Sequence, residues 1–117
     1  SGKNRIEAYS TEGIRIRETL YRDSVIVSPD RIIDNWQPRV FADLEKAHFN
    51  GIIELGPEIV LIGTGGRLMF PDEKLIEPMM RMGIGVEIMD TGAACRAYNF
   101  IAAEGRIVVA ALLAIEA

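Results

Sequence analysis

Hydrophobic and polar positions follow two different patterns along this chain, and the change falls near Gly51. Before that residue, the short run at 14–16 alternates apolar with charged positions, which is typical of a strand with one exposed face. A second run, at 25–27, ends at a Ser-Pro-Asp turn signal. Because these runs are short and closely spaced, we predict a β-meander or hairpin in this part rather than βαβ units.

After Gly51 the apolar runs become longer and nearly continuous. Residues 59–62, 84–89 and 106–113 predict strands that are covered on both faces of a sheet. The segments between them are long enough for helices. The predicted order is therefore β-α-β-α-β, an α/β arrangement within one domain.

Capping residues mark the predicted helices. The first helix begins at Asp72, and the second begins near Thr91 with Asp90 or Thr91 as its cap, because Asp and Thr side chains can accept hydrogen bonds from the free N–H groups of a first turn. Gly83 and Gly105 are suited to end them. Pro78 lies inside the first helix, where it predicts either a restart of the helix or a kink.

Two loops follow the first two of these strands, at residues 63–70 and 90–95. If the strands are parallel, both loops lie at the same sheet edge, where ligands usually bind in open α/β sheets. Glycine-turn amides, a helix N-terminus and two arginines would suit an anion. The candidate ligand-binding residues are Gly63, Thr64, Gly65, Gly66 and Arg67 in the first loop, with Thr91, Gly92, Cys95, Arg96 and Asn99 in the second loop and its helix.

The same loop features also occur where a chain merely connects a strand to a helix. The glycines at positions 63, 65 and 66 lack the spacing of a dinucleotide-binding motif, and no P-loop lysine follows them. Nucleotide binding is therefore not indicated. Our main interpretation is that the two loops only connect strands to helices, and the alternative is that they form a small-ligand site.

Candidate catalytic groups are few. Cys95 is the only cysteine, and a place in the first turn of a helix beside Arg96 would favour its thiolate. A nucleophile also needs a base, and no spacing links the only histidine, His48, to Cys95. We therefore interpret both as structural residues and predict no catalytic residue, no metal site and no cofactor.

Composition and charge narrow the class of protein. The chain of 117 residues is 49% hydrophobic and 26% charged, which suits one globular domain over residues 1–117. Because the first residue is not Met, we expect residues 1–4 to be either a remnant of an expression tag or a disordered end. The net charge of −4 is spread without a basic stripe, which argues against a nucleic-acid partner. The longest apolar run, 107–115, is too short to span a bilayer.

Several short motifs give the chain a resemblance to a known family. On these motifs it resembles the mitochondrial complex I assembly factor 3 family, a domain of unknown function also found in the mammalian adipogenesis-associated protein and in many prokaryotic proteins. The resemblance covers nearly the whole chain and implies a three-layer domain, with a mixed five-stranded central sheet flanked by helices and an N-terminal β-meander. The motifs are Leu61-Ile62-Gly63-Thr64-Gly65, Met89-Asp90-Thr91, Ala93-Ala94-Cys95-Arg96-Ala97-Tyr98-Asn99 and Glu104-Gly105-Arg106.

The resemblance implies a protein partner and no established enzyme activity, since mitochondrial members help to assemble the respiratory NADH dehydrogenase. We predict a non-catalytic partner-binding module that acts on respiratory-complex subunits or another membrane complex. The alternative is a small-ligand or anion binder, or an enzyme, that uses the cleft between loops 63–70 and 90–95. A single cysteine suits a reducing compartment, so we expect the cytoplasm, or the mitochondrial matrix if a presequence has been removed.

Overall fold

The structure is a computed structural model that describes residues 2–116. Within that range the chain forms two β-sheets, three α-helices and two short 3-10 helices. The strands are β1 (Ile6–Ser10), β2 (Gly13–Ile16), β3 (Thr19–Tyr21), β4 (Val25–Val27), β5 (Ile32–Ile33), β6 (Ile59–Gly63), β7 (Gly85–Met89) and β8 (Val108–Leu112). The helices are α1 (Asn50–Glu54), α2 (Glu73–Arg81) and α3 (Thr91–Ala103), with η1 (Phe41–Asp43) and η2 (Lys46–Phe49) as the 3-10 helices.

A mixed five-stranded sheet forms the centre of the molecule. Its strand order is β5-β4-β8-β6-β7, in which β6 is parallel to both β7 and β8. Strand β4 is antiparallel to β5 and β8. The β-α-β-α-β order that the sequence predicts after Gly51 is confirmed, because β6, α2, β7, α3 and β8 follow one another along the chain.

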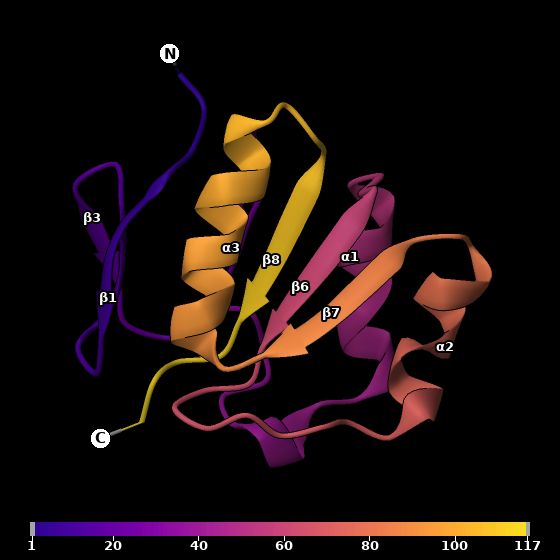
Figure 1. Cartoon of the computed structure of the whole chain (residues 1–117). Helices are drawn as coiled ribbons and strands as arrows, with labels where there is room; N and C mark the ends of the chain where they lie inside the picture. Colours follow the sequence, from indigo (N-terminus) through magenta and orange to yellow (C-terminus); the bar gives the residue numbers. More distant parts are fainter. Residues whose placement is uncertain (1, 117) are drawn as a thin grey trace.

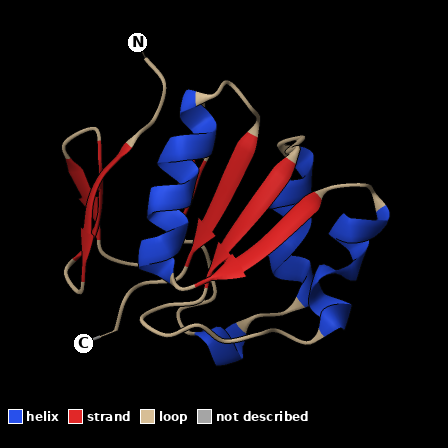
Figure 2. Cartoon of the chain, viewed as in Figure 1, coloured by secondary structure: helices blue, strands red, loops and turns tan. Residues whose placement is uncertain are grey.

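Each face of the central sheet packs against its own hydrophobic core. On one face, α3 and the antiparallel meander β1-β2-β3 bury side chains such as Ile16 and Tyr98. On the other face, α1, α2 and the 3-10 helices bury Phe49 and Met79. Figure 1 shows the meander beside α3, and Figure 2 shows helices on both sides of the sheet. The predicted three-layer α/β domain with an N-terminal β-meander is therefore confirmed.

The helix ends follow the predicted capping chemistry. The carboxylates of Asp72 and Asp90 accept hydrogen bonds from N–H groups in the first turns of α2 and α3. Gly83 follows α2 with φ +81°, a left-handed conformation that glycine adopts without strain. Helix α2 runs through Pro78 without interruption, so the predicted restart at Pro78 is wrong.

The residues before β1 are tied to the fold. Asn4 is only 6% exposed, and its side-chain Nδ2 donates to the carbonyl oxygen of Ser28 at 2.9 Å. The Tyr98 hydroxyl in α3 donates to the Asn4 carbonyl oxygen, also at 2.9 Å. Asn4 is thus packed against the fold, while Ser1 lies outside the described residues.

Candidate functional site

The two candidate loops meet at the carboxyl edge of the central sheet, because β6 and β7 are parallel. The Gly65 N–H donates to Thr91 Oγ1 at 2.8 Å, and the Thr91 N–H donates to the Gly65 carbonyl oxygen at 2.9 Å. Thr91 Oγ1 also donates to the carbonyl oxygen of Leu113, just beyond β8, at 2.7 Å. One fully buried hydroxyl therefore joins the ends of β6, β8 and α3.

Gly63 makes this close approach possible. A Cβ atom at Gly63 would lie 2.9 Å from Thr91 Oγ1 and 3.0 Å from Thr91 Cα. The Cα atom belongs to the helix backbone and cannot move aside as a flexible side chain would. A larger residue at Gly63 would therefore push α3 away from the sheet.

Thr64 holds the first loop in a compact turn. Its side chain is buried, and its Oγ1 donates to the Arg67 carbonyl oxygen at 2.5 Å and accepts the Met69 N–H at 3.1 Å. The Thr64 N–H donates to the Met89 carbonyl oxygen at 2.9 Å. The loop is thus bonded to itself and to the end of β7.

These contacts occupy backbone groups that an anion would need. The N–H groups of Gly65 and Thr91 are bonded across the two loops, as described above. The Ala93 N–H donates to the Asp90 carboxylate at 2.9 Å, and the Ala94 N–H donates to the Asp90 carbonyl oxygen at the same distance. The N-terminus of α3 therefore already has a carboxylate against it, and a second anion there would be repelled.

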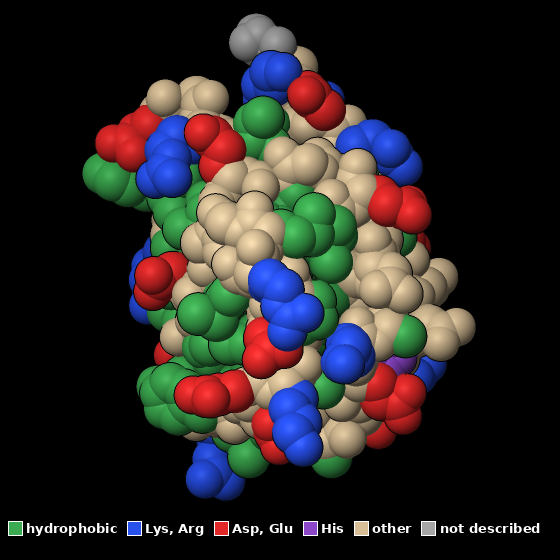
Figure 3. Space-filling model, turned by 90° about the vertical axis from the view of Figure 1, so that its right-hand side faces the viewer, with side chains coloured by type: hydrophobic (Ala, Val, Ile, Leu, Met, Phe, Trp, Pro, Cys, Tyr) green, Lys and Arg blue, Asp and Glu red, His purple; other side chains and the backbone are tan. Residues whose placement is uncertain are grey.

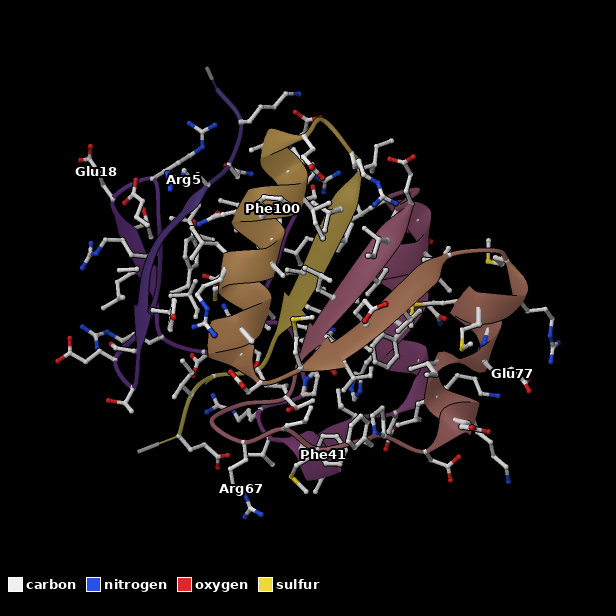
Figure 4. All side chains as sticks on the ribbon, viewed as in Figure 1. Arg5, Glu18, Phe41, Arg67, Glu77 and Phe100 are labelled. Carbon is white, nitrogen blue, oxygen red and sulfur yellow. The ribbon has the colours of Figure 1, made fainter. Side chains whose placement is uncertain are left out.

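The two arginines of the candidate site do not converge. Arg67 is exposed and extends away from the sheet edge (Figure 4). Arg96 donates from Nη1 to the Tyr9 hydroxyl, and its guanidinium carbon lies 5.8 Å from the centre of the Tyr9 ring, a cation–π contact. Arg96 therefore faces the meander, and the structure does not place both cations around one ligand.

Asn99 also faces the meander. Its Oδ1 accepts the Ile6 N–H at 2.9 Å, and its Nδ2 donates to the Ile6 carbonyl oxygen at 2.8 Å. Gly92 lies on the same side of α3, where an added Cβ would approach the Tyr9 ring to 2.8 Å. Gly92, Arg96 and Asn99 thus form a row that anchors the meander to α3. Ligand binding by these residues stays a prediction, which this arrangement does not favour.

Cys95 is buried between α3 and the sheet with 1% of its surface exposed. Burial raises the pKa of its thiol to about 12, and the charge of Asp90 adds to an increase that Arg96 only partly opposes. His48 lies in η2 on the other face of the sheet, where its Nδ1 accepts the Glu45 N–H at 2.9 Å. Because the sheet separates them, Cys95 and His48 cannot form a nucleophile–base pair.

We expect Cys95 to resist thiol reagents in the folded protein. Because burial both raises the pKa of the thiol and covers it, very little thiolate is available to a reagent at about pH 8. Ellman's reagent should therefore label the thiol only slowly in native protein and at once in guanidinium chloride. Equally fast labelling of the two forms would contradict the buried position.

A group of exposed apolar side chains was not among the predicted features of this edge. Leu68, Met69 and Phe70 are 49%, 40% and 74% exposed, and we call these three residues the apolar loop. The position of these residues in the sequence could have indicated their exposure. They lie between a glycine turn and the Pro71-Asp72 helix start, and no strand or helix includes them.

A pocket of about 420 Å³ lies beside the apolar loop. Its walls include Met69 and the ring of Phe41, which Figure 4 shows close to the loop. Thr64, Gly66, Arg67 and Glu116 also line it, so one cation and one carboxylate lie beside two apolar side chains. This mixture suits a protein side chain better than a free anion.

Two further observations bear on the kind of site. Among residues 2–116, no three His, Cys, Asp or Glu side chains gather closely enough to hold a metal ion. In the same range, the structure contains no helix with the length and apolar character needed to cross a membrane.

The model of a family described as protein of unknown function (DUF498/DUF598) matches residues 6–113. The chain belongs to this family. NADH dehydrogenase (ubiquinone) 1 alpha subcomplex assembly factor 3 of Xenopus tropicalis is 33% identical over 110 residues, which are 92% of this chain and 60% of that relative. The resemblance seen in the sequence motifs is therefore confirmed, although this DUF498 chain spans only about 60% of the length of that curated relative.

Solved structures of similar proteins share the DUF498 fold described here. A Bordetella parapertussis protein superposes with a TM-score of 0.91 at 34% identity, over 97% of this chain and 98% of the other. A Bartonella henselae protein described as an outer membrane protein superposes with a TM-score of 0.80 at 32% identity, over 98% of both chains. The fold is thus shared by proteins of about one-third identity that carry different names.

Proposed function

We propose that this chain is a non-catalytic partner-binding module that helps to assemble a respiratory NADH dehydrogenase or another membrane complex. Relatives at 31–33% identity are named as assembly factor 3 of the NADH dehydrogenase 1 alpha subcomplex, which supports the role. The observation that carries the proposal is the apolar loop at the carboxyl edge of the sheet. Its occupant is a protein subunit of the complex being assembled.

The apolar loop has the properties of a docking surface. Adjacent large apolar side chains in contact with water are unfavourable unless a partner covers them. The loop cannot turn these side chains inward, because Thr64 holds the backbone of Arg67 and Met69 on one side. Asp72 caps α2 on the other side. Rigid, exposed aliphatic and aromatic side chains need little ordering on binding, which favours affinity.

The surface charges support a protein partner over a nucleic acid. Figure 3 shows the side of the molecule that carries α2, where Lys and Arg side chains alternate with Asp and Glu. A phosphate backbone is bound by a surface dominated by cations, and this face is not of that kind. At the apolar loop, Arg67 and Glu116 give the same mixture of signs.

Replacing two residues of the apolar loop tests the proposal. The variant carries Leu68→Ser and Phe70→Ser, and Phe100→Ser is the matched control, because Phe100 is a similarly exposed phenylalanine (68%) on the outward side of α3 (Figure 4). We expect tagged wild type and control to recover respiratory-complex subunits from the parent cells. The double variant should recover at least about tenfold less, since two hot-spot side chains are lost. Mass spectrometry against an untagged sample measures the recovery.

Both variants should remain folded, because substitutions of exposed side chains change stability by only about 0.5 kcal/mol. Equal recovery of the subunits by the double variant and wild type would contradict docking at the apolar loop. Failure of folded wild type to recover any subunit of a respiratory or other membrane complex would contradict the assembly role itself.

A further inference from the structure

A second pocket, of about 510 Å³, lies at the amino edge of the central sheet. It is bounded by the turn between β4 and β5, the C-terminal ends of α1 and α3, and the N-terminal segment at Lys3. Figure 1 shows the N-terminal segment and the C-terminal end of α3 at the same end of the molecule, opposite the loops after β6 and β7. A volume of this size is ordinary for a small-molecule site.

One wall of this amino-edge pocket is apolar. It includes Leu55, Ala102, Ala103 and Ile107, and the Ile107 side chain is 49% exposed. The backbone of Ile107 is held firmly, because its N–H donates to the Glu58 carboxylate at 2.8 Å and its carbonyl oxygen accepts the Glu58 N–H at 2.8 Å. An apolar side chain on a fixed backbone is thus left open to a ligand.

The lining also carries more cations than carboxylates, in a chain whose net charge is −4. Lys3 is paired with Asp30 at 2.7 Å, so these two charges offset one another. Arg31 and Arg106 also line the pocket, and neither takes part in an ion pair within residues 2–116. Glu54 is the remaining carboxylate of the lining. The lining therefore contains two arginines and one glutamate, Glu54, that form no ion pair within the described residues 2–116.

We propose that the amino-edge pocket binds a small anionic amphiphile, with its carboxylate or phosphate head on Arg31 and Arg106 and its short apolar tail against Leu55 and Ile107. Guanidinium groups bind both kinds of head through paired, charge-assisted hydrogen bonds. The proposal does not rest on the assembly role, because the pocket and the apolar loop lie at opposite edges of the sheet.

Titration with hexanoate, followed by the backbone amide NMR signals of the protein, tests the pocket. We expect saturable shifts in residues 28–31 and 105–107 at ligand concentrations up to about 20 mM, since small ligands bind weakly. Hexanol lacks the charge and acetate lacks the tail, so each should bind at least about tenfold more weakly. Hexyl phosphate should shift the same residues, and its affinity relative to hexanoate tells which head is preferred.

Charge variants separate ligand binding from damage to the fold, because they predict effects of opposite sign. Arg31→Gln and Arg106→Gln should each weaken hexanoate binding about tenfold. Glu54→Gln removes a like charge and should strengthen it several-fold. Arg22→Gln changes an exposed arginine outside the pocket and should leave the affinity unchanged.

Three results would overturn the proposal. The first is the absence of saturable shifts at residues 28–31 and 105–107. The second is a hexanoate affinity that the combined Arg31→Gln and Arg106→Gln variant leaves unchanged. The third is a protein that shows no response to hexanoate but sediments with phosphatidylglycerol vesicles, while the double arginine variant does not sediment. That result would mean that Arg31 and Arg106 bind a membrane surface.

Discussion

Thr91→Val should lower the unfolding temperature of the protein by roughly 10 °C. Valine keeps the shape of threonine but removes the hydroxyl that accepts the Gly65 N–H and donates to the Leu113 carbonyl oxygen. Both partners are buried, and a buried polar group without a partner costs about 1–3 kcal/mol. We therefore expect urea unfolding to show a loss of about 3 kcal/mol in the free energy of unfolding.

Thr91→Ser is the matched control for this prediction. Serine keeps the hydroxyl and removes one methyl group, so the expected loss is only about 1 kcal/mol. The difference between the two variants isolates the hydrogen bonds of Thr91. Equal stability of Thr91→Ser and Thr91→Val would contradict the role of the hydroxyl in joining β6, β8 and α3.

The place where β6, β8 and α3 meet at Thr91 could be predicted from the sequence, because it depends on residues that are close together in the chain. The apolar run before Gly63 predicts a buried strand, and Asp90 and Thr91 predict a helix start after the next strand. Parallel pairing then brings both strand ends to one edge of the sheet, as the structure confirms. Each step depends on residues that are neighbours in the chain or on a general rule for β-α-β units.

The direction of Arg96 and Asn99 could not be predicted in the same way. Helical periodicity places these two residues on one side of α3, but it does not say which part of the protein lies against that side. The neighbour is β1, whose Ile6 is 93 positions away from Asn99 along the chain. Two of the residues proposed for a ligand cleft, Arg96 and Asn99, therefore contact the meander instead of facing the loops.

The apolar loop shows a second limit of reasoning from patterns. Leu68, Met69 and Phe70 are residues that hydrophobicity alone would assign to a core. In the structure all three are exposed, and the Thr64 hydroxyl fixes the loop backbone through hydrogen bonds to the Arg67 carbonyl oxygen and the Met69 N–H. The sequence does not predict these hydrogen bonds, because a threonine side chain can bond to many different backbone groups.

Asn99→Asp should destabilise the attachment of the meander by about 3 kcal/mol, more than Asn99→Ala, for which we expect about 2 kcal/mol. The new carboxylate still accepts the Ile6 N–H, but it replaces the Nδ2 group that donates to the Ile6 carbonyl oxygen at 2.8 Å. Two oxygens at that distance repel one another, and the charge is partly removed from water. Urea unfolding of the two variants measures the difference.

Hydrogen exchange and the pH dependence of stability test whether repulsion between the new carboxylate and the Ile6 carbonyl oxygen destabilises Asn99→Asp. The Ile6 N–H and the other amides of β1 should exchange faster in Asn99→Asp, while β6 and β8 keep their protection. At about pH 3 the new carboxyl group is mostly protonated and can donate to the Ile6 carbonyl oxygen. The stability of Asn99→Asp should then approach or exceed that of Asn99→Ala. A gap between the variants that stays constant from neutral pH to pH ~3 would mean that the Asn99 amide does not anchor the meander through this bond.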